Sequence, residues 1–231
     1  MREIHGKQVC ETIEEVLDPS GCAVVVIDLQ NDFIRPDGSV AGAGADMSGM
    51  DGILDRCASF IAGARDVGVP VVHIQTITLR DGRSDSPSWL RAKGGIVGAD
   101  FTLEGTDGAE ICAEVAPLPG ETVVVKHRSS AFRQTDLDLV LRAAGVRTVV
   151  VIGVQTPGCV EATYRDAAYH DYYNVLIEDC VAAYDQAQHE ASLLVQRGRH
   201  DVCTAGAALS IWRQAAGRAA GQPGVTAPAA V

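Results

Sequence analysis

The sequence predicts a single α/β domain in which a parallel β-sheet is covered by helices on both faces. Its short runs of apolar and β-branched residues are continuous rather than alternating, as expected for strands that are buried on both faces. Segments with helical periodicity lie between these runs, so strands and helices alternate along the chain. A chain of 231 residues, 47% of them hydrophobic, is long enough to form one domain with a full core.

Strands are expected at five strongly apolar runs and at one weaker run near the C-terminus. The five runs are CAVVVID (22–28), VPVVHIQT (69–76), ETVVVK (121–126), RTVVVIGV (147–154) and NVLIED (174–179), and the weaker run covers 201–205. Helices are expected at 50–68, 135–145, 159–171 and 186–198. Three of them finish at Gly68, Gly145 and Gly198, where glycine can adopt the left-handed conformation that caps a helix.

The domain is expected to span residues 21–212. Residues 1–20 form a lead-in, and residues 213–231 contain almost no bulky apolar side chains, so disorder is expected there. The segment from Arg80 to Pro119 is long, and it carries Trp89 and Phe101. Loops of this length are usually functional, which makes the segment a candidate substrate lid or subunit interface.

Composition argues against several classes of partner and location. A net charge of −11 disfavours nucleic acids and anionic membranes. No apolar run approaches the ~18 residues that a membrane span needs, and the N-terminal residues lack the apolar core of a secretion signal, so a cytoplasmic protein is expected. The seven cysteines are odd in number and form no CxxC pair, which favours reduced thiols over disulfides or a zinc site.

Three polar residues stand where predicted strands end. Asp28 ends the first run, Lys126 ends the third, and Cys159 follows the fourth at the start of a predicted helix. The carboxyl ends of parallel strands share one edge of the sheet, where ligands bind, so these side chains are expected to converge. The amides and the dipole of a helix N-terminus favour a thiolate, which makes Cys159 a candidate nucleophile. Asp28 would take up the thiol proton, and Lys126 would keep that carboxylate ionised.

Each of these residues also has an ordinary structural interpretation. A cysteine near a helix start is often a small buried hydrophobe, an aspartate at a strand end often caps a helix, and a lysine there often lies in solvent. Asp28 and Lys126 could also form a simple ion pair, because charges at the end of a buried strand need a partner. The residues indicate a catalytic site only through their joint placement.

The segments around these residues resemble the three signature regions of the isochorismatase-like cysteine hydrolase superfamily. They are VVVIDLQNDFI (24–34), VVVKHRSSAF (123–132) and VIGVQTPGCVEATYRDA (151–167), and the resemblance extends over about 17–208. It implies a Rossmann-like isochorismatase fold with a six-stranded parallel sheet. The superfamily's catalytic triad falls on Asp28, Lys126 and Cys159.

The resemblance also implies how an oxyanion would be bound. Members of the superfamily commonly carry a cis peptide bond four residues before the nucleophile, which here joins Val154 to Gln155. This bond turns the backbone amide of Gln155 toward that of Cys159, and the two amides form the oxyanion hole.

The function that the resemblance implies is hydrolysis of a C–N bond. Nicotinamidases, N-carbamoylsarcosine amidohydrolases, biuret hydrolases, ureidoacrylate amidohydrolases and streptothricin hydrolases belong to the superfamily. We therefore expect a cysteine-dependent amidohydrolase that cleaves an amide, ureido or carbamoyl bond of a small molecule through a thioester. It would need no cofactor and would form a homodimer or homotetramer. Two alternatives stay open: an amide or lactam hydrolase of a secondary metabolite such as streptothricin, and a non-catalytic or redox-sensing protein on the same fold.

Candidate pocket residues follow the same motifs. Phe33 and Phe132 resemble residues that wall the pocket in the superfamily, and Trp89 is a candidate to cover the substrate. Tyr164 lies one helical turn into the helix after Cys159, where it could face either the cleft or a neighbouring helix. His127 follows Lys126 directly and could line the pocket or cap the strand.

A metal site is not expected. Nicotinamidases carry an aspartate and two histidines as metal ligands between the first two motifs. Residues 43–75 contain a single histidine, His73, which lies in a predicted buried strand and is interpreted as a core residue.

Overall fold

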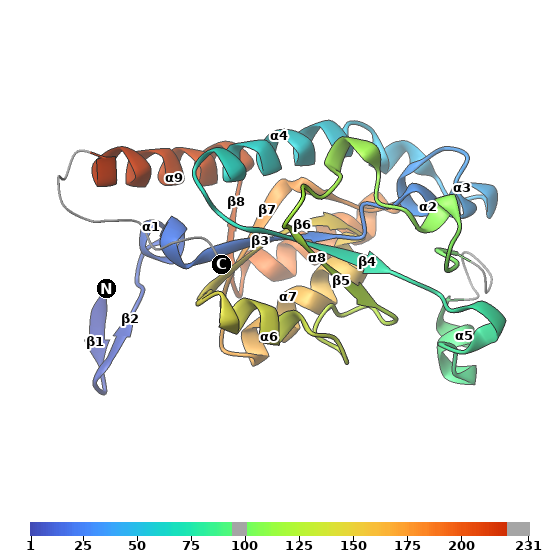
Figure 1. The fold of residues 1–231 in the computed structure, drawn as a ribbon, viewed down its shortest axis with the longest axis horizontal. Coiled ribbons are helices and arrows are strands. Elements are labelled where there is room, and N and C mark those ends of the chain that lie inside the picture. Colours follow the sequence, from blue (N-terminus) through green and yellow to red (C-terminus); the bar gives the residue numbers. More distant parts are fainter. Residues whose placement is uncertain (94–100, 221–231) are drawn as a thin grey trace.

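The computed structural model describes residues 1–93 and 101–220, and its centre is a six-stranded parallel sheet (Figure 1). The strands lie in the order β5-β4-β3-β6-β7-β8, and each neighbouring pair is parallel. Their bounds are β3 Cys22–Ile27, β4 Val71–Thr76, β5 Thr122–Lys126, β6 Thr148–Val154, β7 Tyr173–Ala182 and β8 Asp201–Cys203. The six predicted strands and the α/β class are therefore confirmed.

Continuous apolar runs form these strands because both faces of the sheet are covered. Every residue of β3 and β6 is buried. Along β3, Val24 and Val26 pack into the core on one face, whereas Val25 and Ile27 pack into the core on the other. Burial on both sides of the pleat removes the alternation with polar residues that a half-exposed strand would show.

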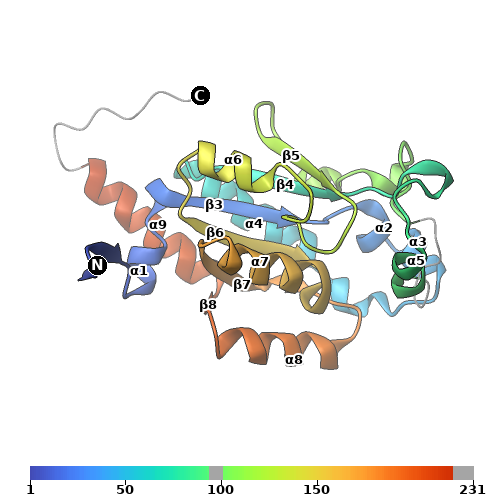
Figure 2. The same ribbon diagram turned by 90° about the horizontal axis from the view of Figure 1, so that it is seen from below.

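Helices form a layer on each face of this sheet. Helices α4 (Ile53–Asp66) and α9 (Ala205–Ala220) cover one face, and α6 (Leu137–Ala143), α7 (Glu161–Tyr169) and α8 (Gln186–Arg197) cover the other (Figures 1 and 2). No helix within the described ranges combines the length and the apolar character needed to span a bilayer.

Helix α9 continues beyond the predicted end of the domain. The expected disorder is wrong for residues 213–220, which are helical, and residues 221–231 lie outside the described residues. Trp212 is completely buried in this helix, with its ring 5.5 Å from that of Phe60 in α4. The anchored tryptophan and the alanine-rich sequence that follows it both favour continuation of the helix.

Two of the three predicted glycine caps have the expected conformation. Gly68 and Gly145 have φ of 76° and 70°, in the left-handed region. The prediction is wrong for Gly198, whose φ is −83°. There the backbone N–H groups of Arg199 and His200 both donate to Gln196 O, so the last turn continues through the glycine without a left-handed cap.

Shorter elements extend from the two ends of the sheet. On the side of the strands' amino ends, the lead-in forms the hairpin β1 (Arg2–Ile4) and β2 (Lys7–Val9), α1 (Ile13–Val16) and the 3-10 turn Pro19–Gly21 (Figure 1). At the carboxyl ends lie α2 (Asn31–Ile34), α3 (Ser39–Gly42) and α5 (Pro87–Lys93) (Figure 1). Short helical turns complete the chain at Met47–Met50, Arg80–Gly82, Asp107–Ala109, Ala113–Val115 and Thr156–Val160.

Candidate active site

The three predicted catalytic residues meet at the carboxyl edge of the sheet. Asp28 directly follows β3, Lys126 ends β5, and Cys159 lies in the turn after β6. The Lys126 ammonium lies 2.8 Å from Asp28 Oδ2 and donates to Cys159 Sγ at 3.3 Å. Lys126 and Asp28 are each 1% exposed, so the charged pair is sealed beneath the half-buried thiol. The contacts of Lys126 thus hold the Asp28 carboxylate and the Cys159 thiol close to the same cation.

Thr76, at the end of β4, is a fourth member of this cluster. Its hydroxyl donates to Asp28 Oδ1 at 2.9 Å and accepts a 2.6 Å hydrogen bond from the Lys126 ammonium. Sequence reasoning missed this residue, although it ends the second predicted strand and so lies on the same edge as Asp28 and Lys126. Its position at the end of that strand is the signal that identifies it.

Backbone geometry at the neighbouring strand ends brings these groups close. Gly153 in β6 has φ of 117°, and a Cβ there would lie 2.1 Å from Ile27 O in β3. The register between β6 and β7 also shifts between Val151 and Gly153. Only glycine fits this approach, so β6 can reach the cluster directly beside Asp28.

The nucleophile turn has the peptide geometry that the resemblance implies. The bond between Val154 and Gln155 is cis. The backbone N–H groups of Gly158 and Val160 both donate to Gln155 O, at 2.9 and 3.1 Å, which folds the turn tightly around Cys159. The turn is of the π type rather than a regular first turn of α7.

Electrostatics at the site keep the nucleophile protonated at rest. Burial raises the pKa of Cys159 to about 12, Asp28 adds to the rise, and Lys126 opposes it. The expectation that helix amides favour a thiolate stays a prediction, because these effects come from burial, Lys126 and Asp28. Burial alone would lower the pKa of Lys126, but the nearby carboxylate of Asp28 outweighs it and the pKa is raised. The resting site thus holds a thiol beside an ammonium, and a base must remove the thiol proton.

A cavity of 320 Å³ adjoins the nucleophile turn. Its lining is mainly apolar, with a few polar groups, and consists of Phe33, Val40, Ala92, Lys93, Phe101, Gln155, Pro157, Gly158, Ala183, Tyr184, Asp185 and Gln188. The predicted pocket residue Phe33 is among them, and its ring lies 5.5 Å from that of Phe101. A small apolar chamber beside a thiol suits a small organic substrate.

Three other predicted pocket residues are not among the side chains that line this cavity, and their roles in substrate binding stay predictions. The Trp89 ring packs against the Arg128 guanidinium at 4.9 Å, outside the cavity lining. The Phe132 ring stacks at 4.8 Å on His170, which follows the far end of α7 from Cys159. Each of these two aromatic side chains therefore makes a local contact with a side chain outside the cavity lining.

Tyr164 faces neither the cavity nor a neighbouring helix, the two orientations expected from its position in the helix. It is completely buried, and its hydroxyl donates to Asp201 O at 2.7 Å, with Asn174 O at 3.3 Å. Asp201 begins β8, and Asn174 is the second residue of β7, so both mark the amino edge of the sheet. Tyr164 therefore packs against the sheet and points away from the cavity.

The cavity residues that sequence reasoning missed come from two segments. Phe101 and Lys93 belong to the long 80–119 segment, where Lys93 forms a buried ion pair with Asp85 at 2.8 Å. Tyr184 follows β7, and its hydroxyl donates to Phe33 O at 2.9 Å. The predicted strand ends at residue 179, whereas β7 runs to Ala182, so Tyr184 lies at a strand end that the sequence pattern does not indicate.

The histidines near the site have structural surroundings. His73 is 1% exposed, and its Nε2 lies 3.1 Å from Glu121 Oε2. His127 donates a 2.6 Å hydrogen bond from Nδ1 to Ile77 O, which links the chain after β5 to the chain after β4. Within the described ranges, no three side chains of His, Cys, Asp or Glu gather as a metal site would require. A nicotinamidase-type metal therefore does not fit these residues.

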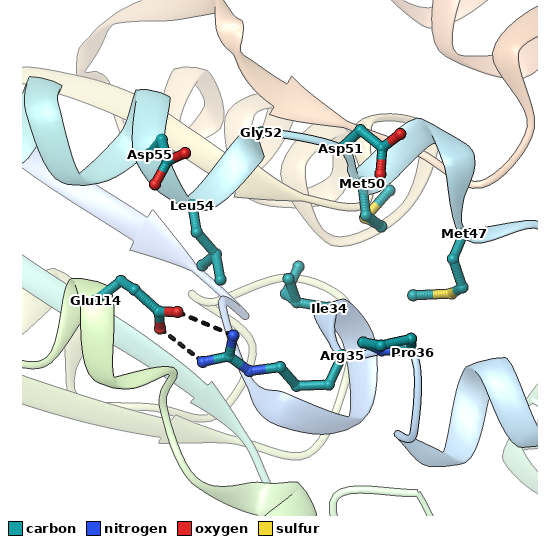
Figure 3. Close-up of a pocket in the computed structure, with 10 residues that line it drawn as sticks. All are labelled: Ile34, Arg35, Pro36, Met47, Met50, Asp51, Gly52, Leu54, Asp55 and Glu114. Carbon is teal, nitrogen blue, oxygen red and sulfur yellow. Dashed lines mark hydrogen bonds and ion pairs between the residues drawn. The ribbon is translucent and has the colours of Figure 1, made fainter.

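A second pocket of 320 Å³ lies on the outside of the domain, between α2 and α4 (Figure 3). Arg35 crosses its mouth and forms two hydrogen bonds with Glu114, at 2.9 and 2.6 Å (Figure 3). The apolar side chains of Ile34 and Leu54 line it. The three predicted catalytic residues line neither of these two pockets, but Gln155, Pro157 and Gly158 of the nucleophile turn line the cavity described above. The cavity beside Cys159 is accordingly the candidate active site.

Comparisons with known proteins agree with this architecture. The isochorismatase domain model matches residues 22–208. The ureidoacrylate amidohydrolase RutB of Variovorax paradoxus is 38% identical over 175 residues, which cover 71% of this chain and 69% of that protein.

Solved structures show the same fold. A cysteine hydrolase from Pseudomonas syringae pv. phaseolicola superposes with a TM-score of 0.74 at 25% identity, covering 85% of this chain and 94% of that one. N-carbamoylsarcosine amidase from Thermoplasma acidophilum gives 0.64 at 30% identity, covering 80% and 96%. The chain belongs to the isochorismatase family and is a hydrolase of carbon–nitrogen bonds.

Proposed function

We propose that this protein hydrolyses the ureido group of a small acid through a covalent intermediate on Cys159. The observation that carries the proposal is the Lys126 ammonium, which contacts both Asp28 and Cys159 beside a 320 Å³ cavity. A buried carboxylate next to a protonated thiol forms a base and nucleophile pair, and the cation stabilises the negative charge as it moves between them.

The first half of the reaction forms a bond to sulfur. Asp28 takes the proton of Cys159, and the thiolate attacks the ureido carbonyl carbon. The backbone amides of Gln155 and Cys159 receive the resulting oxyanion. The C–N bond then breaks, the proton held by Asp28 goes to the leaving nitrogen, and ammonia departs from a thiocarbamate ester, the thioester of a ureido substrate.

The second half returns the free enzyme. Asp28, ionised again, removes a proton from water, whose oxygen attacks the same carbonyl carbon. The C–S bond breaks and the proton returns to the sulfur. The product is a carbamic acid, which separates into carbon dioxide and an amine.

The small size of the cavity and the name of a relative support a ureido acid as substrate. RutB of Variovorax paradoxus carries the name ureidoacrylate amidohydrolase, and ureidoacrylate joins a ureido group to a short carboxylic acid. Lys93 belongs to the lining, and its ammonium is paired with Asp85 at 2.8 Å. A large cationic antibiotic fits less well, because the cavity measures 320 Å³ and Asp185 is the single acid among the described residues that line it.

The cellular setting remains part of the proposal. All seven cysteines are free, as expected in the reducing cytoplasm. Assembly as a homodimer or homotetramer is expected from the family resemblance.

The test compares wild type with Cys159→Ala on 3-ureidoacrylate, 3-ureidopropionate, biuret and nicotinamide. We expect ammonia release from the two ureido acids by the wild type and none by the variant. Intact-mass spectrometry of wild type mixed rapidly with 3-ureidopropionate is expected to show the thiocarbamate adduct on Cys159. Equal ammonia release by both proteins would contradict the covalent mechanism, and release from nicotinamide alone would contradict the substrate class.

A further inference from the structure

The buried carboxylate of Asp32 holds together three segments of chain at the candidate active site. Its Oδ1 accepts hydrogen bonds from the backbone N–H and the hydroxyl of Ser39, at 2.9 and 2.6 Å. Its Oδ2 accepts a 2.6 Å hydrogen bond from the backbone N–H of Thr102. Asp32 lies in α2, Ser39 begins α3, and Thr102 belongs to the 80–119 segment, so one side chain connects three separate stretches.

Asp32, Ser39 and Thr102 each have a sequence neighbour whose apolar side chain forms part of the cavity wall. These walls are Phe33, Val40 and Phe101. The rings of Phe33 and Phe101 lie 5.5 Å apart, so the walls also touch one another. Asp32 is not itself part of the lining. Its carboxylate thus sits behind the cavity surface, at the point where the three walls are anchored.

This carboxylate has little freedom to move. Asp32 is 5% exposed, and Gly108 lies so close that a Cβ on it would be 2.4 Å from Asp32 Cγ. A buried charge requires strong hydrogen-bond donors, and the two N–H groups and one hydroxyl supply them. Because all three are donors, an asparagine at this position would direct its NH₂ group against at least one of them.

We propose that Asp32 is a positioning residue that sets the shape of the substrate cavity, and through it the size of substrate that the enzyme accepts. It acts by fixing Phe33, Val40 and Phe101, not on the reacting atoms. The inference rests on the proposed function only in taking this cavity as the place where the substrate binds. Loss of the carboxylate should therefore change KM and size selectivity more than kcat.

The first experiment uses Cys159 as a reporter and needs no substrate. Its alkylation by iodoacetamide and by the bulkier iodoacetanilide is followed by mass spectrometry in wild type, Asp32→Asn and Gly108→Ala. Gly108→Ala displaces the same carboxylate without removing it. We expect both variants to change the ratio of the two rates by roughly tenfold or more, because small displacements of positioning groups have large kinetic effects.

Asp37→Asn is the matched control. Asp37 is an exposed carboxylate five residues further along the chain, so the substitution makes the same chemical change outside the cavity framework. Its ratio of alkylation rates should equal that of wild type. Folding of every variant is checked by thermal denaturation, and Ser39→Ala, which removes one donor, replaces Asp32→Asn if that protein does not fold.

The second experiment measures steady-state kinetics with 3-ureidopropionate and with the smaller N-methylurea. We expect Asp32→Asn to raise KM for the larger compound roughly tenfold or more while kcat stays within about threefold. N-Methylurea, which reaches less far toward the walls, should be affected less. A merely structural role would lower both activities together, in proportion to the folded fraction.

The outcomes separate this inference from the proposed function. An alkylation ratio that is unchanged in folded Asp32→Asn and Gly108→Ala overturns the role of Asp32. If wild type hydrolyses neither ureido compound, the proposed function fails, while the alkylation ratio still decides whether Asp32 shapes the cavity.

Discussion

The Lys126 ammonium donates a 2.6 Å hydrogen bond to the Thr76 hydroxyl, and this hydroxyl donates a 2.9 Å hydrogen bond to Asp28 Oδ1. The hydroxyl therefore links the cation to the carboxylate a second time, in parallel with their direct 2.8 Å contact. Because a hydroxyl both donates and accepts, it can satisfy the two charged groups at once. This second link holds the Asp28 carboxylate in one orientation beside Cys159.

Replacing Thr76 by Val should weaken both folding and catalysis. Valine keeps the shape but leaves a buried carboxylate oxygen and an ammonium proton unpaired, so we expect the free energy of unfolding to fall by roughly 1–3 kcal/mol. kcat/KM should fall about tenfold or more, since Asp28 is no longer held in place. Urea denaturation and steady-state kinetics test this, and Thr76→Ser, which restores the hydroxyl, should recover most of both losses.

Replacing Asp28 by Asn should abolish most of the reaction while preserving the fold. The amide can still bond to Thr76 but cannot accept the Cys159 proton, so kcat should drop by roughly 10²–10⁴, the range for loss of a general base. Ammonia release is the measurement. Activity above a tenth of wild type would mean that another group removes the proton.

Lys126→Met should make Cys159 even less reactive. Lys126 lowers the pKa of the thiol against the effect of burial, so its removal leaves that pKa higher still. Alkylation by iodoacetamide at pH 8 should then slow, because only the thiolate reacts. Arg128→Met, which removes a nearby cation from the Trp89 contact, serves as the control and should leave the rate unchanged. Faster alkylation in Lys126→Met would contradict the assigned charge effect.

Buried thiols should make the protein sensitive to alkali. Burial raises the pKa of Cys22 from 9.0 to about 12, so the folded state retains a proton that the unfolded state loses. Stability from this thiol is present below pH 9 and is lost as pH rises toward 12, with a slope of about 1.4 kcal/mol per pH unit.

Cys22→Ala should therefore flatten the alkaline decline in unfolding free energy by about that slope. Urea denaturation between pH 8.5 and 10.5 measures it. Val24→Ala, in the same strand, should lower stability without changing the slope, and an identical slope in all three proteins would refute the assignment.

The sheet and the position of the catalytic cluster could be predicted because both follow from local patterns. Buried parallel strands are continuous apolar runs, and such runs end where a polar residue first appears, as at Asp28 and Lys126. Since parallel strands share one edge, knowing where each ends is enough to bring residues from distant parts of the chain together. The shared edge also brings Thr76, which ends the second predicted strand, to this cluster, and Tyr184 follows the end of β7 at Ala182.

The end of β7 was misplaced because tertiary contacts override the local signal. Glu178 and Asp179 look like the end of a strand, but β7 continues through them to Ala182. Glu178 pairs with Arg197 of α8 at 2.6 Å, and Asp179 accepts the backbone N–H of Ala205 at the start of α9. Partners from two later helices thus satisfy charges that would otherwise end the strand.

The sequence by itself determined the fold, the family and the placement of Asp28, Lys126 and Cys159 at the ends of strands. Only the tertiary structure decided the walls of the cavity and the protonation of the nucleophile. An aromatic residue near a motif can pack equally well against the cavity, as Phe33 does, or against Arg128, as Trp89 does. Likewise, the charge state of Cys159 depends on burial, which raises the pKa of its thiol, and on Lys126 and Asp28, which the fold brings beside it.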